Sequence, residues 1–298
     1  MEKKTPESSE TFTRRALLDA ATERLERAGV EHPRRNVEWM LAEVLGCGRA
    51  ALYAHARQEV AAEHRTRFQH MVARREHHEP LQYILGYEEF FGLRIQVTPD
   101  VLIPRPETEE VVEEALRRLE PIDAPRVLDI GTGSGCIALA IQHERPGAVV
   151  SACDVSAGAL DVARRNATAH DADVQFVQAD VRRDALADRV DTPFDLVISN
   201  PPYIPDVEAR TLPTDVRDHE PGTALFTGSD ALCFYRVIAR QAPELLGGDG
   251  WLVVETHAHY ADGVRDVLSA SGAAAVEVRD DLAGRARMAS ARYRSDSD

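Results

Sequence analysis

The hydrophobic pattern of the chain changes once along its length. From residue 12 to about residue 79, apolar positions recur at helical spacing within charged segments such as ALLDAATERLERAGV and RRNVEWMLAEVLG. Glycines and prolines separate these segments, at Gly29, Pro33, Gly46, Gly48 and Pro80. The pattern predicts four or five short amphipathic helices packed as a small bundle.

A stretch with strand character follows, EEFFGLRIQVTPDVLIPRPETEE. Phe91-Gly92 and Pro99-Asp100 are suitable turn points, so we expect a hairpin-like connector here. Thr108 lies just before the next apolar-periodic segment, and it is expected to cap a helix that runs to about Leu119.

From residue 126 onward, short apolar segments alternate with helical ones. RVLDI, AVVSACDV, VQFVQAD, FDLVISN and GWLVVET have the composition of strands, whereas CIALAIQHE and AGALDVARRNATAH are typical of helices. Repeated strand–helix units with nearly continuous apolar strands predict an α/β domain whose parallel sheet is covered on both faces. The last segment, AAAVEVRDDLAGRARMASARYR, adds two strands that include an antiparallel edge pair.

These patterns divide the chain into four parts: a disordered polar tail (1–11), a helical domain (12–86), the hairpin connector (87–104) and the α/β domain (105–298). No apolar run approaches the length of about 20 residues that a membrane-spanning helix needs, and the N-terminus lacks the apolar segment of a signal peptide. The four cysteines are scattered without metal-binding spacing. We therefore expect no disulfide, no metal site and no membrane association, with the cytoplasm as the compartment.

Charge is distributed unevenly along the chain, whose formal net charge is −15. Residues 1–98 carry 15 Lys and Arg against 15 Asp and Glu, whereas residues 99–298 carry 20 against 35. An acidic surface repels the phosphate backbone of a duplex, and no basic cluster offsets it. Stable binding of nucleic acid is therefore not expected.

The segment LDIGTGSGCIAL places a glycine-rich turn between a strand and a helix. Glycine lets the backbone approach a ligand, and the helix N-terminus offers unpaired N–H groups. The spacing GxGxG differs from the GxGxxG of dinucleotide-binding folds. Asp154 ends the next strand, where a carboxylate can accept both ribose hydroxyls of a nucleoside. Asp180 ends the strand after that, where it can accept from an adenine amino group.

The stretch VISNPPYIP ends the fourth strand with residues that do not continue a sheet. Asn200 offers a side-chain oxygen, while Pro201 and Pro202 stiffen the chain and leave the Pro201 carbonyl outside any ladder. Two acceptors on a rigid frame match the two N–H donors of a planar NH₂ group, and the Tyr203 ring can stack on that group. Holding both N–H bonds favours a pyramidal nitrogen that can attack a methyl group, while carbonyl dipoles stabilise its developing positive charge.

Together, the glycine loop and the strand-end acids resemble the class I S-adenosylmethionine (AdoMet)-dependent methyltransferases. The resemblance implies a Rossmann-like, mainly parallel seven-stranded sheet, and a reaction that yields S-adenosylhomocysteine. It also implies a set of residues that hold AdoMet: Asp129, Gly131, Thr132, Gly133, Ser134, Gly135, Asp154, Asp180 and Asn200.

The segments VLIPRPETEE, SNPPYI, EPGTALFTGSDALCFYR and DLAGRAR extend this likeness over nearly the whole chain. They closely resemble the HemK-type (PrmC-type) protein-(glutamine-N5) methyltransferases, which modify the glutamine of the Gly-Gly-Gln motif in class 1 peptide chain release factors. The resemblance implies that the helical domain and the connector help recognise the release factor. It also implies catalytic roles for Asn200, Pro201 and Tyr203, and substrate binding by Asn200, Pro201, Pro202 and Tyr203.

The chain departs from the family pattern at two places. Val181 stands where family members often have an aromatic residue after the third-strand acid, and Glu255-Thr256-His257 replaces the usual Glu-x-Gly. Arg105 and Glu107 are expected to order a loop over the cleft, and Arg287 is either a buried structural partner or a substrate contact.

Three other functions share parts of this pattern. A related glutamine methyltransferase acts on ribosomal protein uL3, and Asn-Pro-Pro-Tyr also occurs in enzymes that methylate adenine N6 in nucleic acid. The adenine enzymes predict basic grooves or an added base-recognition domain, whereas this chain offers a neutral helical domain and an acidic α/β domain. A binding module that keeps the fold without catalysis is the third alternative, and the intact Asn200 and glycine loop argue against it.

Overall fold

The computed structural model describes residues 12–294, so the predicted disordered tail (1–11) lies outside the described residues. The chain forms two compact units, and the boundary between them falls between Leu85 and Gly86. The predicted connector hairpin therefore belongs to the second unit, together with the sheet.

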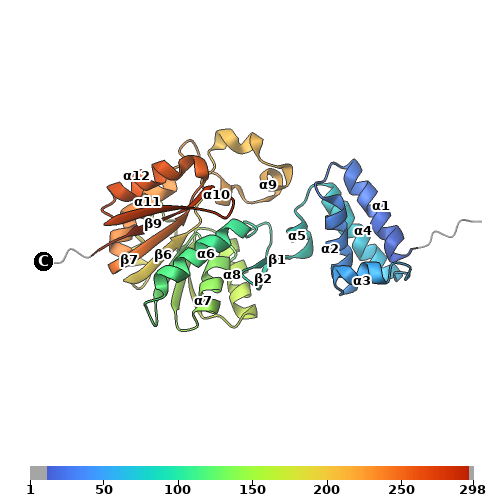
Figure 1. Cartoon of the computed structure of the whole chain (residues 1–298), viewed down its shortest axis with the longest axis horizontal. Helices are drawn as coiled ribbons and strands as arrows, with labels where there is room; N and C mark the ends of the chain where they lie inside the picture. The colour runs from blue at the N-terminus through green and yellow to red at the C-terminus, as the bar shows by residue number, and fades with distance from the viewer. Residues whose placement is uncertain (1–11, 295–298) are drawn as a thin grey trace, which may run out of the picture. The chain divides into compact units, whose positions relative to one another are not determined.

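The first unit is helical, as its sequence pattern predicts. Apolar stripes on its helices meet in a core that includes Leu25, Leu41 and Phe68, each almost fully buried. Gly46 ends the second helix in the left-handed region (φ 58°), which favours glycine. The helices are α1 (Arg14–Arg27), α2 (Pro33–Leu45), α3 (Arg49–Ala54), α4 (Ala62–Glu76) and α5 (Leu81–Leu85) (Figure 1).

A two-stranded hairpin opens the second unit. Strands β1 (Tyr87–Phe90) and β2 (Leu93–Gln96) pair antiparallel around the turn residues Phe91 and Gly92. Both turn residues have positive φ, 51° and 75°, which is the conformation that a two-residue hairpin turn requires. The backbone N–H of Phe91 also donates to Glu109, at 2.7 Å, and so holds the turn against the helix that follows.

The main sheet of the second unit has seven strands in the order β5-β4-β3-β6-β7-β9-β8. The first five strands of this order run parallel, whereas β9 pairs antiparallel with both of its neighbours. The predicted mainly parallel sheet with an antiparallel edge pair is confirmed. Its strands are β3 (Arg126–Ile130), β4 (Val149–Asp154), β5 (Val174–Gln178), β6 (Phe194–Ser199), β7 (Leu246–Glu255), β8 (Ala275–Asp280) and β9 (Ala286–Arg292).

Helices cover both faces of this sheet, because successive residues of each strand point to opposite sides. In β3, Val127 packs into the core under helices α6 (Pro106–Leu119), α7 (Cys136–Glu144) and α8 (Ala157–Ala169). Leu128 packs into the opposite core, under α11 (Cys233–Leu245) and α12 (Ala261–Ala270) (Figure 1). Short helical segments complete the unit: η1 (Leu186–Asp188), η2 (Asp206–Thr211), α9 (Thr214–His219), α10 (Gly222–Leu225) and η3 (Ala258–Tyr260).

The parallel register brings the strand ends that carry the candidate residues to one edge of the sheet. Ile130 pairs with Cys153 of β4 on one side and with Ser199 of β6 on the other. Asp154 pairs with Gln178 of β5. The loops that leave β3, β4, β5 and β6 therefore start side by side. Within residues 12–294 there is no helix long and apolar enough to cross a membrane, and no cluster of metal-ligating side chains.

One buried amide joins the hairpin to the glycine loop. Asn166 of α8 is fully buried, and its Oδ1 accepts from the backbone N–H of Gln96 at 2.8 Å. Its Nδ2 donates to the carbonyl oxygens of Gln96 and Ser134, at 3.0 and 2.9 Å. Removal of this side chain would leave three backbone groups without their partner in the interior, which is costly.

We predict that Asn166→Ala lowers the free energy of unfolding of the second unit by about 2–4 kcal/mol. Urea denaturation followed by Trp251 fluorescence, in a Trp39→Phe background, measures this unit alone because Trp251 lies in β7. Thr168→Ala, which alters an exposed side chain of the same helix, is the matched control and should change stability by less than about 0.5 kcal/mol. Equal stability of the two variants would contradict the assigned role of Asn166.

Candidate active site

The glycine loop that follows β3 is held against the end of β4. The backbone N–H groups of Gly131 and Thr132 both donate to the Cys153 carbonyl, at 2.8 and 3.0 Å. A Cβ at Gly131 or Gly133 would meet open space, whereas a Cβ at Gly135 would lie 3.2 Å from the Cβ of Ala163. The first two glycines thus leave room beside the loop, and the third permits close packing against α8.

A cavity of about 390 Å³ lies beside this loop. Five of the nine predicted cofactor residues line it: Gly131, Gly133, Asp154, Asp180 and Asn200. The other four do not line it: Thr132, Ser134 and Gly135 belong to the loop itself, and Asp129 lies in β3 and bonds to the Thr132 hydroxyl.

The strand-end acids of the cavity are positioned by neighbouring groups. The carboxylate of Asp154 accepts from the backbone N–H groups of Gly133 and Ser156, both at 2.9 Å, and burial raises its pKa. The carboxylate of Asp180 lies 3.3 Å from Nε of Arg182 and 3.5 Å from Nε of Arg183. Each carboxylate oxygen has two lone pairs, so both acids can still accept hydrogen bonds from a bound molecule.

Asp129 lies beneath the loop and is fully buried. Its Oδ2 accepts from the Thr132 hydroxyl at 2.6 Å. Burial raises the pKa of Asp129 to about 7, although the hydrogen bond from Thr132 opposes this shift.

Two aromatic residues that the sequence reading left without a role also line the cavity, Phe226 and Phe234. Phe234 precedes the buried stripe of α11, in which Tyr235, Ile238 and Ala239 face the core. An aromatic residue at a helix start but outside the apolar stripe is the signal that would have identified it. It faces the same cavity as Val181, the position where the chain lacks the family's aromatic residue.

The Asn-Pro-Pro-Tyr segment separates this cavity from a smaller one. It leaves the end of β6, where the Ser199 hydroxyl donates to the Ile130 carbonyl at 2.7 Å. Asn200 and Pro201 line both cavities, whereas Tyr203 lines only the second, whose volume is about 230 Å³. The two residues that carry the predicted acceptors, Asn200 and Pro201, therefore lie where the two cavities meet.

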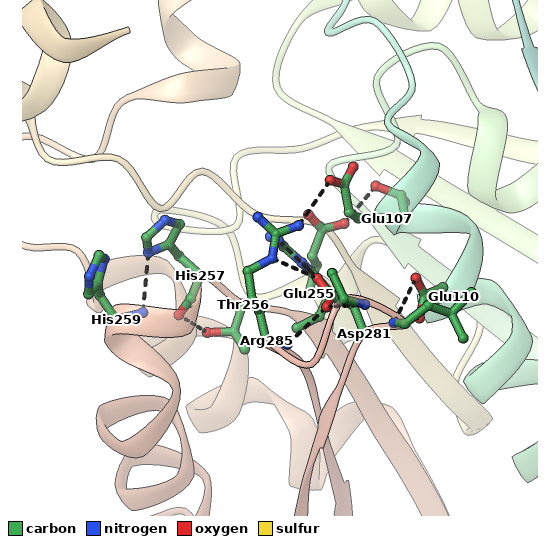
Figure 2. Close-up of polar contacts among 12 residues, drawn as sticks. Glu107, Glu110, Glu255, Thr256, His257, His259, Asp281 and Arg285 are labelled. Atoms are coloured by element: carbon green, nitrogen blue, oxygen red, sulfur yellow. Dashed lines mark hydrogen bonds and ion pairs between the residues drawn. The ribbon is translucent and has the colours of Figure 1, made fainter.

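The Tyr203 ring is bordered by a group of aromatic and imidazole rings. His257 lies with its ring centroid 5.9 Å from that of Tyr203, and its ring is also within 6 Å of the rings of His259 and Tyr260. Figure 2 shows His257 and His259 side by side after the end of β7. Burial raises the pKa of Tyr203, and it lowers the pKa of His257, which the neighbouring His259 lowers further.

The prediction that Thr108 caps helix α6 is wrong. The helix begins at Pro106 with Arg105 as its N-cap residue, because proline is well suited to the first helical position. Thr108 is buried one turn further on. Its hydroxyl donates to Oε2 of Glu255 at 2.6 Å and accepts from Nδ2 of Asn200 at 3.2 Å. Burial raises the pKa of Glu255 to about 7, while the hydrogen bond from Thr108 and the charge of Arg287 oppose the shift.

Ion pairs hold the loops around this site. Arg105 lies 2.6 Å from the buried carboxylate of Glu220, which also accepts from the backbone N–H of Ile103. Arg105 also lines the smaller cavity. Figure 2 shows the Arg285 side chain near the carboxylates of Asp281 and Glu107.

Arg287 is buried and forms an ion pair with Asp281. Its Nε and one terminal nitrogen each lie 3.3 Å from Oδ2 of Asp281. It lines neither of the two cavities. Of its two expected roles, the geometry supports the buried structural partner.

The raised pKa of Asp129 predicts a pH-dependent stability. Between about pH 4 and pH 7 the folded state keeps the Asp129 proton that the unfolded chain loses, so this stabilising contribution declines steadily as pH rises through this range and is lost above about pH 7. Asn cannot ionise. The unfolding free energy of Asp129→Asn, relative to wild type, should therefore rise by about 1.4 kcal/mol per pH unit over this window.

Urea denaturation of both proteins from pH 4.5 to 7.5 measures this difference. Asp161→Asn, at an exposed position of α8, is the control and should give a difference that does not change with pH. A constant difference for Asp129→Asn would contradict a buried carboxyl that ionises late.

Solved structures similar to this chain share its fold. The hMettl16 catalytic domain, solved in complex with an RNA hairpin of the MAT2A 3′UTR, has a TM-score of 0.54 and 17% identity, and covers 80% of this chain and 83% of its own. The Thermus thermophilus 16S rRNA N2 G1207 methyltransferase RsmC has a TM-score of 0.52 and 17% identity over 70% of this chain and 50% of its own. The class I methyltransferase fold is confirmed.

Sequence relatives cover nearly the whole chain. Residues 16–86 match the PrmC N-terminal domain, and residues 112–214 match the methyltransferase small domain. Release factor glutamine methyltransferases from Geobacter sulfurreducens and Xylella fastidiosa are 45% and 42% identical to it. The alignments cover 89% and 92% of this chain, and 92% and 95% of the relatives. The chain belongs to the family of release factor glutamine methyltransferases.

Proposed function

We propose that this protein transfers a methyl group from AdoMet to the side-chain amide nitrogen (N5) of the glutamine in the Gly-Gly-Gln motif of class 1 peptide chain release factors. The observation that carries this proposal is the pair of cavities that meet at Asn200 and Pro201. One cavity is bordered by the glycine loop, and the other by Tyr203. A methyl donor in the first and an amide in the second would face each other across these two residues.

The larger cavity has the chemistry that AdoMet requires. Its charged lining residues are three acids, Asp100, Asp154 and Asp180, and one base, Arg182, which suits a ligand that carries a sulfonium cation. Asp154 and Phe234 line this cavity, where a carboxylate can accept from ribose hydroxyls and an aromatic ring can stack on adenine. The open space beside Gly131 and Gly133 admits a ligand close to the backbone.

AdoMet supplies an electrophilic methyl group, and the residues of this chain prepare the nucleophile. Asn200 Oδ1 and the Pro201 carbonyl oxygen would accept the two N–H bonds of the glutamine amide, and acceptors that hold these hydrogens out of the amide plane weaken the conjugation of its lone pair. The Tyr203 ring lies against the flat amide. Both acceptors are dipoles whose negative ends face the nitrogen, so they would stabilise the positive charge that develops there as the methyl group passes to it from the sulfonium sulfur, which would leave as S-adenosylhomocysteine. One amide proton would then pass from the nitrogen to solvent. No side chain has to remove that proton beforehand.

The fixed position of the two acceptors accounts for much of the expected rate of methyl transfer. Pro201 and Pro202 fix the backbone that carries both acceptors, and the β6 strand that precedes them is buried between β3 and β7. A rigid frame spares the cost of ordering these groups when the substrate binds. The smaller cavity is lined mainly by apolar side chains, including Leu212, Val216 and Leu225, and this suits the methylene groups of a glutamine.

We assign the release factor as substrate on the basis of family membership and the acidic surface. The PrmC N-terminal domain match covers the helical unit, to which we assign release-factor recognition. An acid excess of 35 over 20 in residues 99–298 disfavours DNA or RNA as the substrate. A substrate that takes part in translation also supports a cytoplasmic location for the enzyme.

Methyl transfer from radiolabelled AdoMet tests the substrate directly. We expect label in purified release factor, located by mass spectrometry on the motif glutamine, and none in a release factor whose motif glutamine is replaced by alanine. Ribosomal protein uL3, RNA and DNA are incubated in parallel. Labelling of any of these in place of the release factor would overturn the assignment.

Two substitutions separate the roles of the cavities. Asn200→Ala should lower the rate of methyl transfer by about 100- to 1,000-fold, because one of two acceptors of the developing charge is lost, with AdoMet affinity changed less than about threefold. Asp154→Ala should instead weaken AdoMet binding first. Isothermal titration with AdoMet and single-turnover kinetics measure the two effects. Normal turnover of Asn200→Ala would refute its assigned role.

A further inference from the structure

The orientation of the Asn200 amide matters to the proposed reaction. An asparagine amide has an acceptor end and a donor end of nearly the same shape, so its partners decide which end faces a cavity. The glutamine nitrogen of the substrate offers two donors. Only Oδ1 of Asn200 can accept from it, and an amide turned by 180° would set its own NH₂ against the substrate NH₂.

Three side chains from distant parts of the sequence form a chain of hydrogen bonds. Glu255 at the end of β7 accepts from the Thr108 hydroxyl at 2.6 Å, and Thr108 accepts from Asn200 Nδ2 at 3.2 Å. Thr108 and Glu255 are almost fully buried, with 2% and 1% exposure. A hydroxyl has a single proton, and here that proton is given to the carboxylate. Thr108 is thus left with lone pairs alone for Asn200.

We propose that Thr108 and Glu255 are positioning residues, which hold the donor end of the Asn200 amide and so turn its acceptor end toward the substrate glutamine. The inference deepens the proposed function and rests on it. Neither residue lines either of the two cavities. Glu255 acts through Thr108, and Thr108 acts through Asn200.

Protonation of Glu255 would reverse the direction of the hydrogen bonds along this chain of side chains. A protonated carboxyl can donate to Thr108, and the Thr108 hydroxyl can then donate to Oδ1 of Asn200, with the NH₂ end turned toward the cavity. Burial raises the pKa of Glu255 to about 7, so the change falls within an accessible pH range. Other groups act on this carboxyl or its backbone from several elements: Arg287, Glu107, Arg105, Tyr203, Tyr235 and Cys136. Arg287 and Arg105 favour the charged carboxylate, and Glu107 opposes it.

The test compares Thr108→Val, which replaces the hydroxyl by a methyl group of similar size, with Thr108→Ser, which keeps the hydroxyl. For the full-length enzyme with AdoMet and release factor, we expect Thr108→Val to lower kcat by about 10- to 100-fold, with the Kd for AdoMet changed less than threefold. Thr108→Ser should restore most of the lost kcat. A similar loss in both variants, or a kcat within threefold of wild type in Thr108→Val, would overturn the proposal.

The pH profile of kcat separates positioning from a merely structural role. In wild type, kcat should fall as pH is lowered through the ionisation of Glu255, and Thr108→Val should lose this acid limb because the carboxyl no longer reaches Asn200. Thr108→Ser should keep it. A wild-type kcat without an acid limb, or an unchanged limb in Thr108→Val, would contradict the mechanism.

Glu255→Gln supplies an independent variant in case Thr108→Val does not fold, and a thermal melt of each protein identifies that case. A glutamine can donate to Thr108 as the protonated acid does, so we expect a low kcat that varies little with pH below 7. Full activity of this variant would refute the role of Glu255. If wild type itself transfers no methyl group to release factor, then the proposed function fails. If wild type is active and all three variants match it, then only the positioning role fails.

Discussion

The parallel pairing of β3 with β6 is the constraint on which the site depends. It sets Ile130 opposite Ser199, and the Ser199 hydroxyl bonds the Ile130 carbonyl across the strand ends. Adjacent strands lie about 4.8 Å apart, so the glycine loop and Asn200 begin as neighbours before any side chain is considered. A register slip of one residue would turn every side chain of β6 to the other face of the sheet, so the side chains that face each core would be exchanged.

The sequence predicts most of this frame because its signals are local and repeated. RVLDI and CIALAIQHE coincide with β3 and α7. The short apolar run, the glycine turn and the helical segment each favour locally the same structure that the whole fold requires. The Phe91-Gly92 turn was likewise readable from two residues. The convergence of Asp154 and Asn200 on one cavity followed from the rule that parallel strands end at the same edge.

The parts that were not predictable depend on contacts between distant segments. Thr108 has the sequence context of a cap, but Pro106 already fits the first helical position, and the Thr108 side chain is buried against Glu255, 147 residues away. Phe234 lines the same cavity as Val181 because α11 packs against β6 and β7. His257 lies beside Tyr203 because β7 pairs parallel with β6, so both strands end at the same edge of the sheet. No local sequence pattern predicts these contacts.

The same contacts explain why an amide suits position 200 in this chain. Its two ends face partners of opposite kind: Thr108, which offers lone pairs, and a substrate nitrogen, which offers protons. An aspartate could accept from the substrate, but it has no proton for Thr108, and it would place a second negative charge near the buried Glu255. Like charges in a buried site raise each other's pKa, so one of the two acids would become neutral and the acceptor at the cavity would no longer be assured. The neutral amide of Asn200 avoids a second buried acid, because one end donates to Thr108 and the other accepts from the substrate. The positive charge that develops on the substrate nitrogen is then stabilised by the carbonyl dipoles.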